Sequence, residues 1–364
     1  MKKIVFLVTT LNSGGIENYL LRFLSFFDGQ LEPIVICKGN FFGELEEDYK
    51  KIKFIQLIKI NIGYVNLYSY FKLYKLLKNK KIQTVCDFTG NFSGLTLFTA
   101  NIAGITNRIA FYRNSEIKFR KIFLKLVYNR FVRFMVLYNA TKILSNSETA
   151  LIYFYPNKYK NDQRFKVINN GIDFLSFRSS ESLKRTEFDI PENSFVIGHT
   201  GRYDSQKNHI TILRVAEKIC LKHNNIYILL CGKDTDIYLS EIVLKSNILK
   251  DKVKILGYRN DINCILPMLD LFFFPSTIEG QPNSLIEAMI TGLPIVASNI
   301  NPIKETTPQV LHKELIAPMN VNGFCARIEE YYFSKKKRES SNFSDWAKDR
   351  FDPKILFNSF YTEL

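Results

Sequence analysis

The segment Glu279-Gly280-Gln281-Pro282-Asn283-Ser284-Leu285-Ile286-Glu287 decides how this 364-residue chain is organised. It follows the apolar run Leu271–Phe274, which is typical of a buried strand, and it leads to Gly292, a residue type that often ends a helix. Pro282 suits the first position of a helix, because its φ is fixed and its missing N–H would be unpaired there. The segment therefore predicts a strand, a loop and a helix over about residues 283–291.

A second strand-to-helix segment carries two cations. The apolar run Phe195–Thr200 is followed by Gly201, Arg202 and Lys207. Ligands of open α/β sheets bind outside the carboxyl ends of the strands, and the first amides of a helix attract phosphate. Two cations, helix-start amides and the two carboxylates of the first segment together predict a site for a diphosphate with hydroxylated groups at both ends. A nucleotide-sugar is such a ligand.

The ordered motifs resemble the family-four retaining glycosyltransferases, the glycosyl transferases group 1, as in bacterial polysaccharide biosynthesis. The matching motifs cover nearly the whole chain: Gly14-Gly15-Ile16-Glu17, Ser145-Asn146-Ser147-Glu148, Asn170-Gly171-Ile172-Asp173, Gly201-Arg202 with Lys207-Asn208, Leu256-Gly257-Tyr258 with Asp261, and the segment from Pro275 to Ser298. The resemblance implies an α/β chain of GT-B fold. Two Rossmann-like domains with mainly parallel sheets would then face each other across an interdomain cleft.

Apolar runs alternate with amphipathic segments in both halves, which by itself predicts parallel sheets covered by helices. This rhythm restarts near Phe195, after a polar passage over residues 173–193 that we expect to link two domains. We expect an acceptor-binding domain over residues 1–172 and a donor-binding domain over residues 190–350. The resemblance implies that a C-terminal helix over about residues 352–364 packs back on the first domain.

The resemblance also implies roles for single residues. Arg202 and Lys207 would hold the donor diphosphate and stabilise the charge that develops on it. Glu279 would contact the donor sugar, and Glu287 would bind the ribose hydroxyls. The remaining expected donor contacts are Gly14, Gly15, Gly201, Tyr258, Gly280, Gln281, Pro282, Asn283, Ser284 and Leu285. The donor is expected to be a UDP-sugar.

The chain departs from the family at Phe111-Tyr112-Arg113-Asn114, where many relatives carry one or two His. Arg113 is a catalytic candidate that could stabilise charge or bind an anionic acceptor, or it could merely extend a basic surface. An inverting enzyme needs a general base, and none of these four side chains is a competent base near neutral pH. The segment therefore favours retention of the anomeric configuration.

Two further motifs bear on cofactors. The Gly14-Gly15 loop lacks the third Gly and the acidic residue of a dinucleotide fingerprint, which disfavours an oxidoreductase. Asp234-Thr235-Asp236 resembles the metal-binding acidic triplet of the other major glycosyltransferase fold, but it lies apart from the donor motifs. We therefore expect metal-independent transfer and no cofactor besides the donor substrate.

The net charge of +15 is concentrated in one region. Between Lys51 and Lys142 there are 17 Lys or Arg against two acidic residues, an excess equal to that of the whole chain. In a predicted helix over residues 117–138, helical spacing places four cations on one face: Lys118, Lys121, Lys125 and Arg133. Its other faces carry apolar residues that we expect to pack: Ile122, Phe123, Leu126, Val127, Phe131, Phe134 and Met135. We expect this region to bind an anionic membrane surface; nucleic acid is disfavoured, because no motif for it is present.

No apolar run approaches the ~20 residues that span a bilayer, and the six cysteines lack a paired spacing. We expect reduced thiols in a cytoplasmic protein that is peripheral at the inner face of the plasma membrane. The predicted function is transfer of a sugar to a lipid-linked glycan in O-antigen or capsule synthesis. The alternatives are a nucleotide-sugar epimerase of the same fold and a non-catalytic membrane-docking scaffold that retains the donor pocket.

Overall fold

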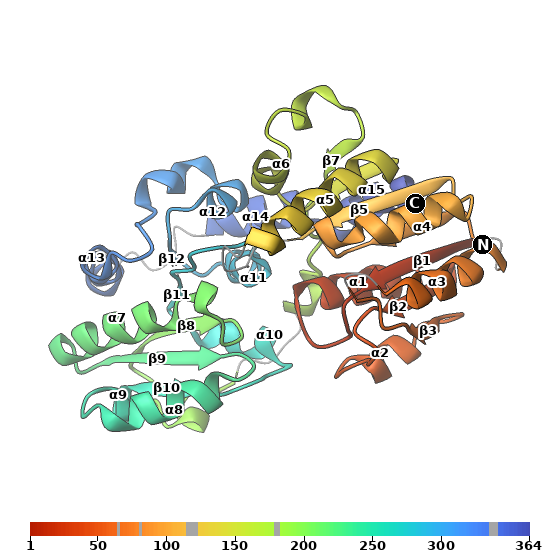
Figure 1. Ribbon diagram of the computed structural model, residues 1–364. Coiled ribbons are helices and arrows are strands. Elements are labelled where there is room, and N and C mark those ends of the chain that lie inside the picture. Colours follow the sequence, from red (N-terminus) through yellow and green to blue (C-terminus); the bar gives the residue numbers. More distant parts are fainter. Residues whose placement is uncertain (64–65, 80–81, 114–122, 178–182, 335–340) are drawn as a thin grey trace. The chain divides into compact units, whose positions relative to one another are not determined.

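The computed structural model describes residues 1–63, 66–79, 82–113, 123–177, 183–334 and 341–364, and it divides into two compact units (Figure 1). Unit 1 comprises Met1–Gly171 and Pro353–Leu364, and unit 2 comprises Ile172–Asp352. Each unit contains one sheet whose described strand pairs are all parallel. The prediction of an α/β chain with two parallel sheets is confirmed.

The sheet of unit 1 has the strand order β3-β2-β1-β4-β5-β6-β7. Its strands are β1 Lys2–Val8, β2 Leu31–Cys37, β3 Gln56–Lys59, β4 Thr84–Asp87, β5 Asn107–Tyr112, β6 Lys142–Ser145 and β7 Phe165–Val167. The sequence did not predict β7, because three residues with a Lys in the middle carry no readable apolar pattern.

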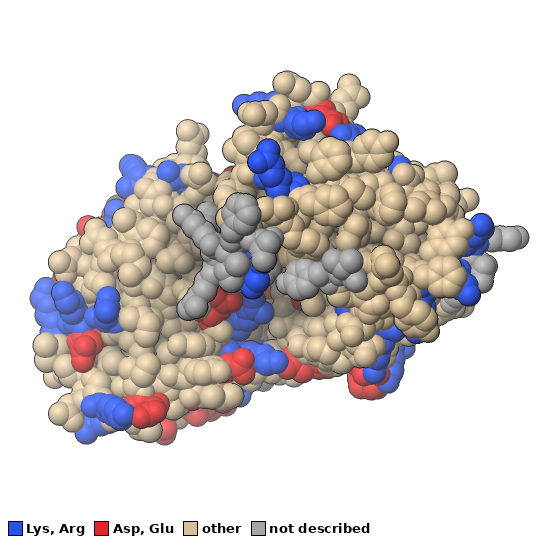
Figure 2. All heavy atoms as spheres, viewed as in Figure 1, with Lys and Arg blue, Asp and Glu red and all other residues tan. Residues whose placement is uncertain are grey.

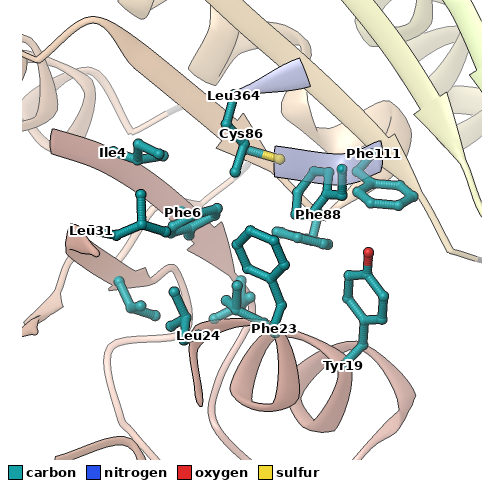
Figure 3. Close-up of a cluster of buried hydrophobic side chains, with 14 of the residues drawn as sticks. Ile4, Phe6, Tyr19, Phe23, Leu24, Leu31, Cys86, Phe88, Phe111 and Leu364 are labelled. Atoms are coloured by element: carbon teal, nitrogen blue, oxygen red, sulfur yellow. The ribbon is translucent and has the colours of Figure 1, made fainter. Parts of the chain in front are cut away.

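Two hydrophobic cores cover the two faces of this sheet. Side chains alternate along β1, so that Ile4 and Phe6 belong to one core and Val5 and Leu7 to the other. The first core is closed by aromatic residues of α1 and of the C-terminal helix α15, and Figure 3 shows part of it. The second core lies under α3, α4 and α5. The helices of unit 1 are α1 Gly15–Phe26, α2 Glu46–Lys50, α3 Leu67–Asn79, α4 Gly94–Ile102, α5 Phe123–Asn139, α6 Glu148–Phe154 and α15 Pro353–Glu363.

The sheet of unit 2 has the strand order β10-β9-β8-β11-β12, with β8 in the centre. Its strands are β8 Phe195–Thr200, β9 Ile226–Cys231, β10 Val253–Ile255, β11 Leu271–Phe274 and β12 Ile295–Ala297. The helices are α7 His209–Lys222, α8 Thr235–Lys245, α9 Leu249–Lys252, α10 Ile262–Ile265, α11 Asn283–Ile290, α12 Asn301–Thr306, α13 Val321–Phe333 and α14 Ser341–Arg350. A core between α7, α13 and the sheet is built from Ile, Leu, Val and Phe side chains.

The passage predicted to link two domains is held within unit 2. Arg185 donates to the carbonyl of Met268 and forms an ion pair with Asp270 at 2.8 Å. Ile190 is buried. These contacts bind the passage to the loop before β11, so residues from Ile172 onwards belong to the second unit.

Candidate functional site

Two loops leave neighbouring strands of unit 2 at the same edge of the sheet. The strands β8 and β11 pair in parallel, so their carboxyl ends lie side by side. The loops are bonded to each other, because the Thr277 amide donates to the Gln206 carbonyl at 2.8 Å. The side-chain amide of Asn208 donates to the carbonyls of Pro275 and Pro318 at 3.0 and 2.9 Å. These bonds join the two predicted donor segments into one platform.

Lys207 and Glu279 meet on this platform. The Lys207 Nζ atom lies 2.7 Å from the Glu279 Oε1 atom, and both side chains are largely buried. The ammonium also lies 5.0 Å from the centre of the Phe274 ring. The two residues expected to bind the diphosphate and the sugar are therefore ion-paired with each other.

Arg202 extends from the same loop but is more exposed. Its side chain is 54% exposed, and its Nη2 atom lies 3.4 Å from an Asp204 oxygen. Asp204 also accepts from the Gln206 amide at 3.0 Å, which caps the short 3₁₀ turn Ser205–Lys207. Because an exposed pair at this distance is weak, Arg202 can turn to an anionic ligand at little cost.

Helix α11 begins directly after the Glu279 loop. Pro282 precedes the helix as its N-cap with extended backbone (φ −79°, ψ 97°), so the prediction that it takes the first helical position is wrong by one residue. The first amides of a helix have no carbonyl within the helix to bind, and here they follow Glu279 by a few residues. Leu285 is fully buried, so only its backbone can contact a ligand, whereas Glu287 is half-buried. Gly280, Asn283 and Ser284 are half-buried, and Gln281 is buried.

Several polar atoms near the ends of β8 and β11 are buried without a partner. The hydroxyls of Thr200 and Ser276 and the Nε2 atom of His199 are buried, and none has a hydrogen-bond partner among the described residues. Buried polar groups are normally paired, so each of these atoms is a candidate for a ligand contact.

Two histidines lie beneath the platform. His199 and His209 pack edge to face with ring centres 5.2 Å apart, and His199 Nδ1 lies 2.9 Å from the Phe273 carbonyl oxygen. Burial, with a smaller contribution from the nearby Lys207 ammonium, lowers the pKa of His209 to about 4. Burial and the neighbouring His209 lower the pKa of His199 well below its ordinary value. Both rings are therefore neutral near pH 7.

Gly201 leaves little room for a side chain beside His199 and Lys207. A Cβ atom at this position would lie 3.0 Å from His199 Nε2 and 3.2 Å from the Lys207 side chain. The absence of a side chain lets Lys207 cross the loop toward Glu279.

The remaining sequence candidates of unit 2 are Tyr258 and the two aspartates of the acidic triplet. The Tyr258 ring is 56% exposed. Asp234 precedes α8 in a left-handed conformation (φ 64°), and the Asp236 carboxylate packs against Gly257. Among the described residues, no three His, Cys, Asp or Glu side chains are grouped so that they could hold a metal ion.

Unit 1 holds the other three candidates. Gly14 is the N-cap of α1 with extended backbone, and Gly15 is its first residue. Arg113 follows β5 and is 93% buried, since its relative exposure is 7%. The possibility that Arg113 merely extends a basic surface is therefore wrong. Its Nη2 atom donates to the Gly15 carbonyl at 3.3 Å, and its guanidinium lies 4.0 Å from the centre of the Tyr19 ring.

Sequence reasoning overlooked three residues that build the platform: Asn208, His199 and His209. Asn208 adopts a left-handed conformation (φ 58°) before α7 while its side chain ties two loops together. Its position directly after a cation and before an apolar helix was a usable signal, because Asn tolerates this conformation. The two histidines gave no signal of their own, because only the fold brings them together.

Comparisons with known proteins show which family and which fold this chain resembles. Residues 180–344 match the family model described as glycosyl transferases group 1, which spans the platform and most of unit 2. The resemblance expected from the motifs is confirmed. The fold is also that of solved glycosyltransferases: HepE of Anabaena in complex with UDP-glucose superposes with a TM-score of 0.80 at 19% identity, covering 100% of both chains. The chain has the GT-B fold.

Two curated relatives extend the match beyond unit 2. The capsular polysaccharide biosynthesis glycosyltransferase CapH of Staphylococcus aureus is 26% identical over 359 residues, covering 95% of this chain and 94% of CapH. The UDP-Gal:alpha-D-GlcNAc-diphosphoundecaprenol alpha-1,3-galactosyltransferase of Escherichia coli is 28% identical over 285 residues, covering 75% of this chain and 72% of that enzyme.

Proposed function

We propose that this chain, whose residues 180–344 match the family model described as glycosyl transferases group 1, transfers a sugar from a UDP-sugar to a lipid-linked glycan in bacterial capsule or O-antigen synthesis. The observation that carries the proposal is the Lys207–Glu279 pair beside the start of α11. The names of the relatives support the substrates, since the E. coli enzyme uses UDP-Gal and a diphosphoundecaprenol-linked acceptor. CapH supports the pathway.

Donor binding would use the charges of the platform. Arg202 and Lys207 bind the diphosphate, and the first amides of α11 add the positive end of the helix dipole. As the diphosphate takes the place of its carboxylate partner, Lys207 is released to stabilise the leaving group. Glu279 would then accept hydrogen bonds from the donor sugar, while Glu287 would bind the ribose hydroxyls. This exchange of partners keeps the buried ammonium paired throughout.

The transfer would retain the anomeric configuration. The bond between the sugar and the diphosphate breaks, the acceptor oxygen bonds to the same face of the sugar, and the departing phosphate oxygen takes the acceptor proton. No protein base is then required, in keeping with Phe111, Tyr112 and Arg113 at the end of β5. Proton NMR of the freshly formed linkage tests this step, and an inverted anomer would contradict the role given to Glu279.

The transfer would also proceed without a divalent metal. Arg202, Lys207 and the helix-start amides together supply the positive charge that a metal supplies elsewhere. Turnover after exhaustive chelation tests the point. Complete loss of activity that manganese or magnesium restores would return Asp234 and Asp236 to consideration as ligands.

The acceptor would reach the protein at an anionic membrane surface through the layer of α3, α4 and α5. The α5 residues Val127, Phe131, Phe134 and Tyr138 follow helical spacing and are 48–75% exposed. The expectation that Leu126, Val127, Phe131 and Phe134 pack into the core is therefore wrong, because α5 packs through Val132 and Val136 instead. No helix in the described part of the chain is long and apolar enough to span a membrane.

The neighbouring helices add to this outer surface. Tyr68 and Phe71 of α3 and Ile102 of α4 are also more than half exposed, and α4 contacts both α3 and α5. Figure 2 shows this side of unit 1 as largely uncharged, with Lys and Arg toward its rim. An apolar face with cations around it suits shallow insertion between anionic lipid headgroups.

The charge distribution of the basic region differs from the sequence expectation. Lys118 and Lys121 lie outside the described residues. Arg133 donates to the Phe154 carbonyl, and Lys142 forms an ion pair with Glu363. Part of the charge excess therefore serves internal contacts, and the apolar stripe of α5 carries more of the proposed membrane contact than the sequence indicated.

Vesicle co-sedimentation tests the membrane proposal. The double variant Phe131→Ser, Phe134→Ser should lose binding to anionic vesicles while it still binds UDP. The matched control is Leu221→Ser, Phe333→Ser, which removes two residues of unit 2 that are 71% and 66% exposed. Equal sedimentation of both double variants would contradict the proposal.

A further inference from the structure

The guanidinium of Arg113 is a buried charge with an incomplete set of contacts. Its Nη1 atom is buried and has no hydrogen-bond partner among the described residues. Its Nη2 atom makes one long bond, 3.3 Å to the Gly15 carbonyl. The guanidinium carbon lies 4.0 Å from the centre of the Tyr19 ring and 5.2 Å from the centre of the Phe111 ring, so aromatic rings pack against it.

This guanidinium lies beside the first turn of α1. Gly15 is the first residue of this 12-residue helix, and the N-cap Gly14 supplies no side-chain bond to the helix amides. The Glu17 carboxylate is folded against Gly14, because a Cβ atom there would lie 2.6 Å from Glu17 Oε2. Glu17 and Arg22 are the charged side chains that act on Arg113 here.

Burial of a charge without a full set of partners is costly. Burial lowers the pKa of Arg113 to about 10, with Arg22 adding to the effect, so the group remains a cation near pH 7. An anion bound at Nη1 would supply the missing acceptor and would also meet the positive end of α1. A neutral ligand would not offset the unfavourable free energy of burying the positive charge.

We infer that Arg113 and the first turn of α1 bind an anionic group of the acceptor, a phosphate or a carboxylate. The inference rests on the proposed function, which assigns the acceptor to unit 1. A lipid-linked acceptor would present the diphosphate between lipid and glycan, whereas an acidic glycan would present a sugar carboxylate. Arg113 then determines which acceptors are used, and Glu17 sets how strongly the site attracts an anion.

The test uses the full chain with its donor site saturated by UDP, so that a second anion reports on unit 1. Wild type is titrated by calorimetry with inorganic pyrophosphate and, separately, with glucuronate. R113M should weaken binding of the preferred anion by about tenfold or more, as expected for loss of a charged hydrogen bond, and R113K should lie between the two. E17Q should bind the same anion more tightly than wild type, because it removes a nearby negative charge.

The two arms separate the sources of the anion, since a lipid-linked acceptor predicts that pyrophosphate is preferred and an acidic glycan predicts glucuronate. Unchanged affinity of R113M in both arms overturns the inference, and so does a loss of UDP affinity in R113M. If R113M does not fold, the E17Q variant provides the test. Anion binding by E17Q that is weaker than, or equal to, that of wild type overturns the inference. Wild type that fails to bind UDP contradicts the proposed function itself, whereas UDP binding with an insensitive R113M contradicts only the inference.

Discussion

The two units place charge at the carboxyl ends of their strands in opposite ways. In unit 2 the Lys207 ammonium and the Glu279 carboxylate lie 2.7 Å apart, on loops that bond to each other. In unit 1 the Arg113 guanidinium is buried with an N–H that lacks an acceptor among the described residues. A ligand of unit 2 must therefore take the place of an internal partner, whereas a ligand of unit 1 supplies a partner that is missing.

This difference suits two separate roles, donor binding in unit 2 and acceptor selection in unit 1. A site with an internal ion pair stays ordered when it is empty, which suits a donor with the same diphosphate in every turnover. A site with an incomplete set of contacts draws its affinity from the ligand, which suits selection among acceptors. Substitutions in unit 2 should therefore change donor binding and transfer, and substitutions at Arg113 should change acceptor preference.

The largest effect should follow from Lys207→Ala. Loss of the ammonium removes both the diphosphate contact and the stabilisation of the leaving group, so kcat should fall about 10²–10³-fold. The control is Lys218→Ala on α7, since this exposed lysine binds Asn322 and not the platform. Steady-state kinetics with a UDP-sugar decide the matter, and a kcat within twofold of wild type would remove Lys207 from the mechanism.

Substitution of Gly201 or Gly15 by Ala should have smaller effects, and the two effects should differ. The sequence predicts a donor contact for both glycines. Gly201→Ala places a Cβ atom 3.0 Å from His199 Nε2 and 3.2 Å from the Lys207 side chain, so KM for the donor should rise severalfold. Gly15→Ala meets nothing within 4 Å and lies at a helix start, where Ala stabilises by up to about 1 kcal/mol.

The comparison of these two variants is informative in both directions. Gly15→Ala with wild-type kinetics would remove the expected close approach of ligand to Gly15. A large loss of activity in Gly15→Ala would instead show that a ligand reaches the first turn of α1. Gly201→Ala with an unchanged KM would mean that Lys207 does not depend on the packing of its loop.

The smallest effect concerns acid stability, and the contribution of the histidines should be confined to unit 2, because all four follow residue 171. The folded-state pKa of His209 is about 4, below its ordinary value of 6.5. The unfolded chain therefore takes up a proton first, and stability falls as the pH drops from 6.5 toward 4, by about 1 kcal/mol per pH unit for one histidine.

The variant His209→Gln should make this dependence less steep, while His199, whose pKa burial also lowers, continues to contribute. Denaturant unfolding followed by the fluorescence of Trp346, the single tryptophan, reports on unit 2. Parallel pH profiles of wild type and variant would show that the burial of His209 has no energetic consequence in this range.

The sequence predicted the strands that consist of apolar runs. It was less informative for a helix with two apolar faces, because either face could pack against the core. The strands β8 and β11 agree to the residue with the runs Phe195–Thr200 and Leu271–Phe274. In α5, however, Val132 and Val136 form one apolar stripe and Phe131 and Phe134 another. Periodicity identifies both stripes, but only tertiary packing decides which one is covered.

The candidate site was predictable as two loops and not as a set of contacts. Strand ends and helix starts indicate where ligands bind, so the motifs pointed to the segments around Lys207 and Glu279. Their contact joins residues 72 positions apart in the chain and follows from the pairing of β8 with β11. The burial of Arg113 was not readable, because an Arg after a strand is usually solvated.

The most direct test of the central claim, a UDP-sugar site on the platform of unit 2, is calorimetric titration of wild type, Glu287→Ala and Arg202→Ala with a panel of nucleotide-sugars. We predict that wild type binds a UDP-sugar and that each variant binds it about tenfold or more weakly, with unfolding behaviour unchanged. Wild-type affinity in both variants would contradict the account and place the donor elsewhere.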